Sequence, residues 1–125
     1  MYADTAYYFN EYDGSIIAEE ELEKALEKAS RHIDTLTYNR IVGKGFSNLT
    51  KFQQSIIKEV CCSLADFETE NAELINSMLK SYSLNGVSMT FGSSWNVSVE
   101  DGVAIRSDLY ERLQQTGLCC KSLGV

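Results

Sequence analysis

The stretch EEELEKALEKASRHIDTLT, residues 19–37, decides the fold because its apolar residues recur at three- and four-residue intervals. This spacing puts them on one face of an α-helix and leaves the charged residues on the other face. The apolar positions are Leu22, Ala25, Leu26, Ala29, Ile33 and Leu36. Glu19, Glu20 and Glu21 come first, where the positive end of a helix dipole favours carboxylates. The sequence therefore predicts an amphipathic helix over 19–37.

A second helical pattern begins near Leu49 and Thr50 and extends toward Met78. Its apolar residues keep the helical period at Phe52, Ile56, Ile57, Val60, Cys61, Leu64, Phe67, Leu74 and Ile75. A break over 68–71, where polar residues cluster, is the alternative. Residues 39–48 hold two glycines and are expected to form a loop between the two helices. The chain has no proline, so long helices are permitted.

The first fourteen residues form an aromatic N-terminal segment. Asp4 can cap a short helix that carries Tyr7, Tyr8, Phe9 and Tyr12. Such a cluster of rings either packs over the helical bundle or forms a contact surface. Both possibilities stay open from the sequence.

Residues 84–99 change to the alternation of a β-hairpin. Val87, Met89 and Phe91 share one side of the first strand, and Trp95, Val97 and Val99 share that side on the returning strand; residues 92–94 make the turn. Two strands are marginally stable unless they pack on something. Either the chain's own helices or a neighbouring subunit covers this apolar side, and the hairpin is expected to protrude between the helices.

A last helix is expected from about Val103 to Gln115. Gly117 can adopt the left-handed conformation that ends a helix, and Leu118 can fold back onto the last turn. Residues 117–125 then form a C-terminal tail. Together these patterns predict one domain over 1–125, a mainly α fold in which a small bundle of long helices carries one β-hairpin.

Composition limits the function. The net charge of −7 and the pI near 4.6 argue against binding nucleic acid by broad phosphate neutralisation. No apolar run long enough to span a bilayer is present, and residues 1–4 lack the basic and apolar regions of a signal peptide. We therefore expect synthesis in the cytoplasm and no membrane partner.

The four cysteines form two adjacent pairs, Cys61-Cys62 and Cys119-Cys120. Adjacent side chains on a helix diverge and cannot chelate a metal as a spaced pair does. We interpret the thiols as reduced, small apolar fillers, and expect the pair in the tail to be the more accessible.

No catalytic constellation can be assembled from the remaining polar residues. The single histidine, His32, lies on the first long helix, where packing or a hydrogen bond is its expected role. Residues 43–45, Gly-Lys-Gly, lack the spacing of a phosphate-binding loop. Glu68, Glu70 and Glu73 form a cluster of carboxylates on the second helix, and no helix combines basic and base-reading residues. The sequence predicts no enzyme, no cofactor, no metal site and no sequence-specific DNA binding.

The order of several short features resembles the small head–tail connector proteins of tailed bacteriophages. These features are Tyr7-Tyr8, Asp13-Gly14 leading into Ile16-Ile17, the helix with Ala29, Ile33-Asp34 and Thr37, Val60-Cys61-Cys62, the strand from Gly86 to Phe91, and Thr116-Gly117-Leu118. Cys119-Cys120-Lys121 departs from the bulkier apolar residues expected there, whereas Gly124-Val125 fits.

The resemblance implies a virion structural protein, encoded by a phage or a prophage, that catalyses nothing. Such subunits form a ring under the portal, with its twelve-fold symmetry, contact a tail or stopper protein, and let DNA pass through without sequence-specific binding. It implies candidate contacts with other subunits or with the portal at Val87, Met89, Phe91, Trp95, Val97, Leu118 and Val125. Glu68, Glu70 and Glu73 are candidates to face the DNA channel. The alternative is a small helical phage protein that binds DNA or a packaging partner.

Overall fold

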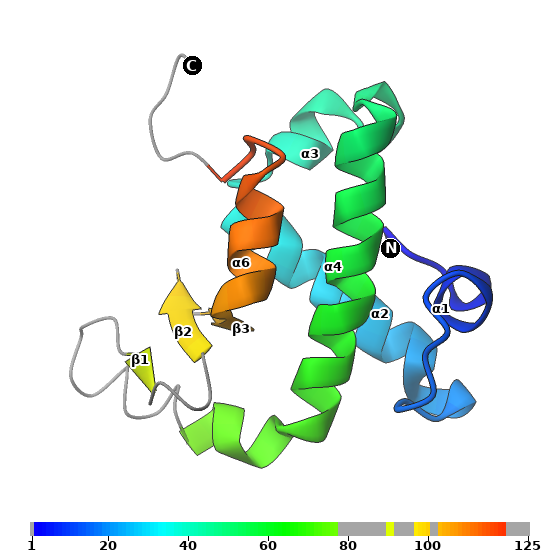
Figure 1. The fold of residues 1–125 in the computed structure, drawn as a ribbon, viewed down its shortest axis with the longest axis vertical. Helices are drawn as coiled ribbons and strands as arrows, with labels where there is room; N and C mark the ends of the chain where they lie inside the picture. The colour runs from blue at the N-terminus through cyan, green and yellow to red at the C-terminus, as the bar shows by residue number, and fades with distance from the viewer. Residues whose placement is uncertain (1, 78–89, 92–96, 101–102, 120–125) are drawn as a thin grey trace.

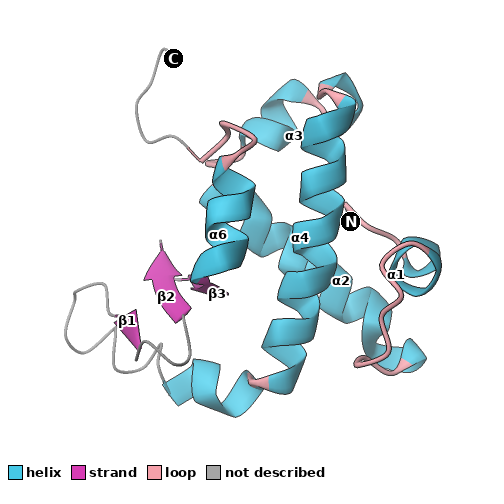
Figure 2. Cartoon of the chain, viewed as in Figure 1, coloured by secondary structure: helices cyan, strands magenta, loops and turns pink. Residues whose placement is uncertain are grey.

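The chain is mainly helical (Figures 1 and 2). Its computed structural model describes residues 2–77, 90–91, 97–100 and 103–119. The helices are α1 (Thr5–Asn10), α2 (Glu19–Leu36), α3 (Arg40–Lys44), α4 (Lys51–Glu70), α6 (Ser107–Gln114) and a 3₁₀ turn, η1 (Phe46–Asn48); residues 72–77 are also helical. The strands are β1 (Thr90–Phe91), β2 (Val97–Glu100) and β3 (Val103–Arg106). This confirms the predicted fold class.

The prediction of a helix over 19–37 is confirmed, since α2 spans Glu19–Leu36. Its apolar stripe is the centre of the core, and most of its members are fully buried: Leu22, Leu26, Ala29, Ile33 and Leu36. Ala25, the sixth member, is half-buried. The helix begins with three exposed glutamates, where the dipole stabilises negative charge.

The second long helix also forms. The prediction that it continues toward Met78 is wrong, and the alternative of a break over 68–71 is confirmed, because α4 ends at Glu70. Thr50 caps the first turn of α4 by accepting from the Gln53 backbone N–H at 3.1 Å. The Gln53 side chain accepts in turn from the Thr50 N–H at 3.0 Å, which completes a capping box. Asn71 is its C-cap residue, and residues 72–77 form a separate helical segment.

The two long helices cross in opposite directions. Glu21, near the start of α2, borders the same hollow as Thr69, near the end of α4. Midway along both helices, Ser30 Oγ lies 3.4 Å from Cys61 Sγ. Helix α6 also packs against α4 (Figure 1). The apolar core therefore lies among α2, α4, α6 and strand β3.

The aromatic N-terminal segment packs on the bundle. Asp4 caps α1, as predicted, by accepting from the Tyr7 backbone N–H at 2.7 Å. Tyr8 is fully buried, whereas Tyr7 and Tyr12 pack partly buried against the core. Phe9 remains 40% exposed. Packing is therefore the main role of the segment, with one ring left at the surface.

The expected loop over 39–48 is largely wrong, because most of it is helical. Tyr38 and Asn39 adopt left-handed backbone conformations, with φ of 55° and 58°, which turns the chain after α2. Burial of Ile41 then fixes the short helix α3 against the core. The two glycines indicated a loop, but only Gly45, with φ of 88°, ends this helix.

The described part of the hairpin is antiparallel, as predicted, and the turn predicted over 92–94 lies outside the described residues. β1 and β2 pair with Phe91 opposite Val97 and Thr90 opposite Ser98. A three-residue turn would place Phe91 opposite Trp95, so the predicted register is wrong by two residues. The expected helix start at Val103 is wrong, because residues 103–106 form β3, which pairs with β2. Val103, Ala104 and Ile105 are all buried, and β-branched residues favour a strand in such surroundings. The chain becomes helical only at Ser107.

The last helix ends as its sequence predicts. Gly117 has φ of 77°, the left-handed conformation, and Leu118 is 7% exposed. Thr116 Oγ1 donates to the Leu113 carbonyl at 2.7 Å and accepts from the Leu118 N–H at 3.2 Å. The residues that follow α6 are therefore folded onto the domain up to Cys119.

Candidate functional site

The candidate contact residues of the hairpin lie only partly in the described structure. Val87, Met89 and Trp95 fall outside the described residues. Phe91 lies in β1 and pairs with Val97, whose side chain is fully buried. Val97 therefore packs into the chain's own core. At this position the apolar side of the hairpin is covered by the chain itself and not by a neighbouring subunit.

The start of the predicted C-terminal tail is fixed to the domain by two side chains. Arg40 Nη1 donates to the Leu118 carbonyl at 3.0 Å, and Gln53 Nε2 donates to the Thr116 carbonyl at 2.9 Å. Because Leu118 is buried, it belongs to the core rather than to an open contact surface. Val125 lies outside the described residues. Thr116 and Leu118 thus lie beside α3 and the first turn of α4.

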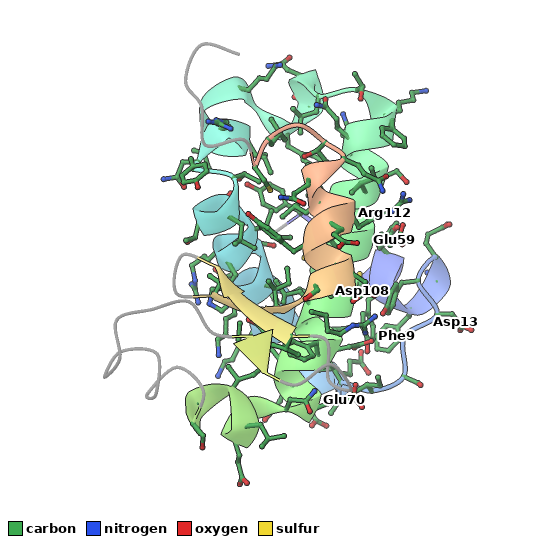
Figure 3. All side chains as sticks on the ribbon, turned by 60° about the vertical axis from the view of Figure 1, so that its left-hand side comes forward. Phe9, Asp13, Glu59, Glu70, Asp108 and Arg112 are labelled. Atoms are coloured by element: carbon green, nitrogen blue, oxygen red, sulfur yellow. The ribbon has the colours of Figure 1, made fainter. Side chains whose placement is uncertain are left out.

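The three candidate channel-facing carboxylates occupy different environments. Glu70 and Glu73 are exposed, and Glu70 lies near the end of α4 (Figure 3). The Glu68 side chain is only 10% exposed and pairs with Nδ1 of His32 on α2. The expectation that His32 makes a hydrogen bond is confirmed. Glu68 is paired with His32 of α2, so of the three carboxylates Glu70 and Glu73 are the exposed ones.

A pocket of about 130 Å³ opens beside the His32–Glu68 pair. Its polar lining comes from Lys28, His32, Glu68 and Asn76, and its apolar lining from Ala72, Ile75, Val103 and Ala104. Oε2 of Glu68 faces His32, whereas Oε1 is buried and finds no hydrogen-bond partner among the described residues. A buried carboxylate oxygen without a donor is costly, so this oxygen marks an unmet binding position.

Charges of opposite sign gather at the two ends of α2. Residues 11–23 hold six acidic side chains and no basic one, whereas residues 38–58 hold four basic side chains and no acidic one. Residues 24–36 of α2 lie between these segments, about 20 Å of helix at 1.5 Å per residue. The acidic segment thus lies at one end of α2 and the basic segment at the other.

Each charged end also exposes large apolar side chains. Ile16 is 47% exposed just before α2, and Val42 and Phe52 are 64% and 58% exposed on α3 and α4. We call Ile16, Glu19, Glu20 and Glu23 the acidic patch, and Val42, Lys44, Lys51 and Phe52 the basic patch. Neither patch is predicted from the sequence, because Val42 falls in the expected loop and Phe52 falls in the apolar pattern of the second helix. The run of basic residues over 38–58 was the available signal.

The described thiols are buried. Burial raises the pKa of Cys61, and it raises the pKa of Cys62 to about 12, so both remain protonated at neutral pH. The role of apolar filler therefore fits both residues. The expectation that Cys119 is accessible is wrong, because its exposure is 5%. Cys120 lies outside the described residues.

Neither a metal-binding cluster nor a membrane-spanning helix is found among residues 2–77, 90–91, 97–100 and 103–119. There, no three His, Cys, Asp or Glu side chains gather in a group that could hold a metal ion. Nor does any helix of that part of the chain combine the length and apolar character needed to cross a bilayer.

Comparison of the chain with protein families, curated proteins and solved structures finds no match in any of the three. What the chain does is therefore inferred from its own residues and surfaces.

Proposed function

We propose that this chain is a structural subunit of a ring under the portal of a tailed bacteriophage, where it joins the head to the tail. The subunit acts by binding copies of itself, the portal protein and a tail or stopper protein, and DNA passes through the ring without sequence-specific contacts. It is made in the cytoplasm of the bacterial host and resides at the head–tail junction of the virion. It is not an enzyme and needs no cofactor.

The observation that carries this proposal is the complementarity of the acidic and basic patches. A closed ring needs a heterologous contact, in which one surface of each subunit fits a different surface of the next. The basic patch offers two lysines around Val42 and Phe52, and the acidic patch offers three glutamates beside Ile16. Opposite charge steers the two surfaces together, and the apolar side chains supply buried area.

Two further features support the connector role. The helix, strand and tail segments follow one another in the order that the resemblance implies. Thr116 and Leu118, where the tail begins, are held by Gln53 and Arg40 at the basic end, so a contact of the tail with a protein beyond the ring starts at this end. Exposed Glu70 and Glu73 repel phosphate and suit a channel wall along which DNA slides.

Two charge-reversed variants test the contact between patches. Lys44→Glu with Lys51→Glu makes both ends acidic, and Glu20→Lys with Glu23→Lys makes both ends basic. In sedimentation velocity runs at low salt, the native chain should self-associate and each variant alone should remain monomeric. An equimolar mixture of the two variants should associate again, because each then meets an opposite charge.

The control is Glu111→Lys, a change of the same kind on the exposed side of α6, which should associate like the native chain. Association should weaken toward 1 M salt, where the Debye length falls to about 3 Å. A variant that self-associates as well as the native chain, or a mixture that stays monomeric, would contradict the proposed contact.

One observation favours the alternative function of binding DNA. Arg40, Lys44, Lys51 and Lys58 lie in one stretch without an acidic residue. If this stretch bound phosphates, duplex DNA would shift in a gel-retardation assay at physiological salt, and Lys44→Glu with Lys51→Glu would abolish the shift. The connector role predicts no such shift, and co-purification of the chain with tailed particles in stoichiometric amounts.

A further inference from the structure

The His32–Glu68 pocket is a second feature, independent of the charged patches. It is formed by α2, α4, residues 72–77 and β3, so four separate segments meet around one buried carboxylate. A shallower hollow of about 240 Å³ adjoins it, bordered by Glu21, Ala25 and Ala65, and it shares Lys28, Glu68 and Ala72 with the pocket. Small alanine side chains thus leave room on both sides of Glu68.

The polar groups of the pocket define the ligand as a donor of hydrogen bonds. Glu68 Oε1 is an ionisable acceptor that no described residue satisfies. When the neutral His32 ring donates its Nδ1 proton to Glu68, its other ring nitrogen, Nε2, is an acceptor. Asn76 adds a side-chain amide, which also contains an acceptor oxygen. A ligand that carries several N–H groups on a positive charge matches this set.

A guanidinium group fits these requirements best. It is planar, remains charged at all physiological pH values, and presents five N–H donors in a fixed fork. One N–H can reach Glu68 while a second reaches His32, and charge-assisted hydrogen bonds of this kind are short and strong. The apolar walls formed by Ile75, Val103 and Ala104 suit the methylene groups of an arginine side chain.

The size of the pocket favours a side chain over a free metabolite. Sites for whole small molecules usually enclose about 300–1,000 Å³. At about 130 Å³, this pocket holds only the end of a side chain. We propose that the His32–Glu68 pocket receives the guanidinium group of an arginine side chain from another protein chain. Lys28 borders the pocket and competes with this group for Glu68.

The single histidine of the chain is a unique reporter of the pocket. The His32 ring resonances can be followed by NMR while N-acetyl-arginine methylamide is added. They should shift and saturate. N-acetyl-lysine methylamide should bind more weakly because it offers a single donor group. Tetramethylammonium, a cation without N–H groups, should cause no saturable shift. A linear response, or an equal response to tetramethylammonium, would overturn the proposal.

Variants locate the binding group. Glu68→Gln should weaken binding of N-acetyl-arginine methylamide by about tenfold or more, because a charge-assisted hydrogen bond is lost. Glu27→Gln, an equal change at an exposed position of α2, should leave the affinity unchanged. Unchanged affinity in a folded Glu68→Gln chain would exclude Glu68 as the binding group.

Lys28→Met keeps the proposal testable if Glu68→Gln fails to fold. The Lys28 side chain is exposed, so its replacement should leave the circular dichroism spectrum unchanged and raise the affinity for the arginine probe. A fall in affinity would overturn the proposal, because removing a competing positive charge must favour a cationic ligand held by Glu68. Methylguanidinium distinguishes the source of the ligand: if it binds but N-acetyl-arginine methylamide does not, the occupant is a free guanidino compound and the proposed side chain is wrong.

Discussion

The hydroxyl group of Tyr8 in α1 donates a 2.6 Å hydrogen bond to Oδ1 of Asp66 in α4. The same hydroxyl oxygen accepts from the backbone N–H groups of Ile16 and Ile17, each at 3.2 Å. Tyr8 is fully buried and Asp66 is 6% exposed, so the hydrogen bond between their side chains is shielded from water. One phenol group thus joins α1, the segment before α2, and α4.

Replacing Tyr8 with Phe should destabilise the chain by about 1–3 kcal/mol, because buried Asp66 loses a donor and two backbone N–H groups lose their acceptor. Urea denaturation measures the free energy of unfolding. Tyr7→Phe is the matched control on the same helix: the ring under Lys58 is kept and the stability should change little. Equal stability of the Tyr8→Phe chain would contradict this role of the hydroxyl.

Stability should fall at alkaline pH through the same residue. Burial and the hydrogen bond to Asp66 raise the pKa of Tyr8 from 10.0 to about 12. The native state therefore holds this proton more tightly than the unfolded state does. The contribution is fully present below pH 10 and is lost as the pH rises through 12.

The difference in unfolding free energy between the native chain and Tyr8→Phe should therefore shrink between pH 10 and pH 12. Burial also raises the pKa of Tyr2, Tyr7 and Tyr12, and their contribution cancels in this comparison. A difference that stays constant up to pH 12 would show that Tyr8 ionises alike in both states.

Two glycines should respond to alanine in opposite directions. A Cβ on Gly14 would lie 2.2 Å from Cζ of Tyr8, so the buried ring would have to move, at a cost of about 1–3 kcal/mol. A Cβ on Gly43 meets nothing within 4 Å inside helix α3, where alanine gains about 0.5–1 kcal/mol. Thermal unfolding of both variants measures these effects, and equal melting temperatures would contradict the contact at Tyr8.

The proposal that Glu70 and Glu73 face a DNA channel can be tested by reversing their charge. Replacing Glu70 and Glu73 with lysine should slow the exit of DNA from triggered particles, because lysine attracts phosphate where glutamate repels it. Glu68 is kept in this variant since it is paired with His32. An unchanged rate of DNA release would place both residues away from the channel.

The helices were predictable where local signals were strong. The apolar stripe over 19–37, the cap at Asp4 and the left-handed Gly117 each act within one or two turns, and the structure confirms all three. Strand β3 was not predictable in the same way. Val103, Ala104 and Ile105 form a short apolar run that fits a strand or a helix, and pairing with β2 decides between them.

The pocket was beyond sequence reasoning for a different reason. His32 and Glu68 are separated by 36 residues, and only the crossing of α2 and α4 brings them together. The sequence groups Glu68 with Glu70, two positions away in the chain, as a candidate for the channel face. On a helix, that spacing turns the two side chains to different faces, one toward α2 and one toward solvent.

The most direct test of the connector role is electron microscopy of phage particles that lack this chain. The reading frame would be deleted from the phage that encodes it, and the particles would be imaged beside those of the parent. We expect heads that lose their DNA or carry no tails, and restoration of tailed particles when the chain is supplied in trans. Normal tailed virions from the deletion phage would contradict the connector role.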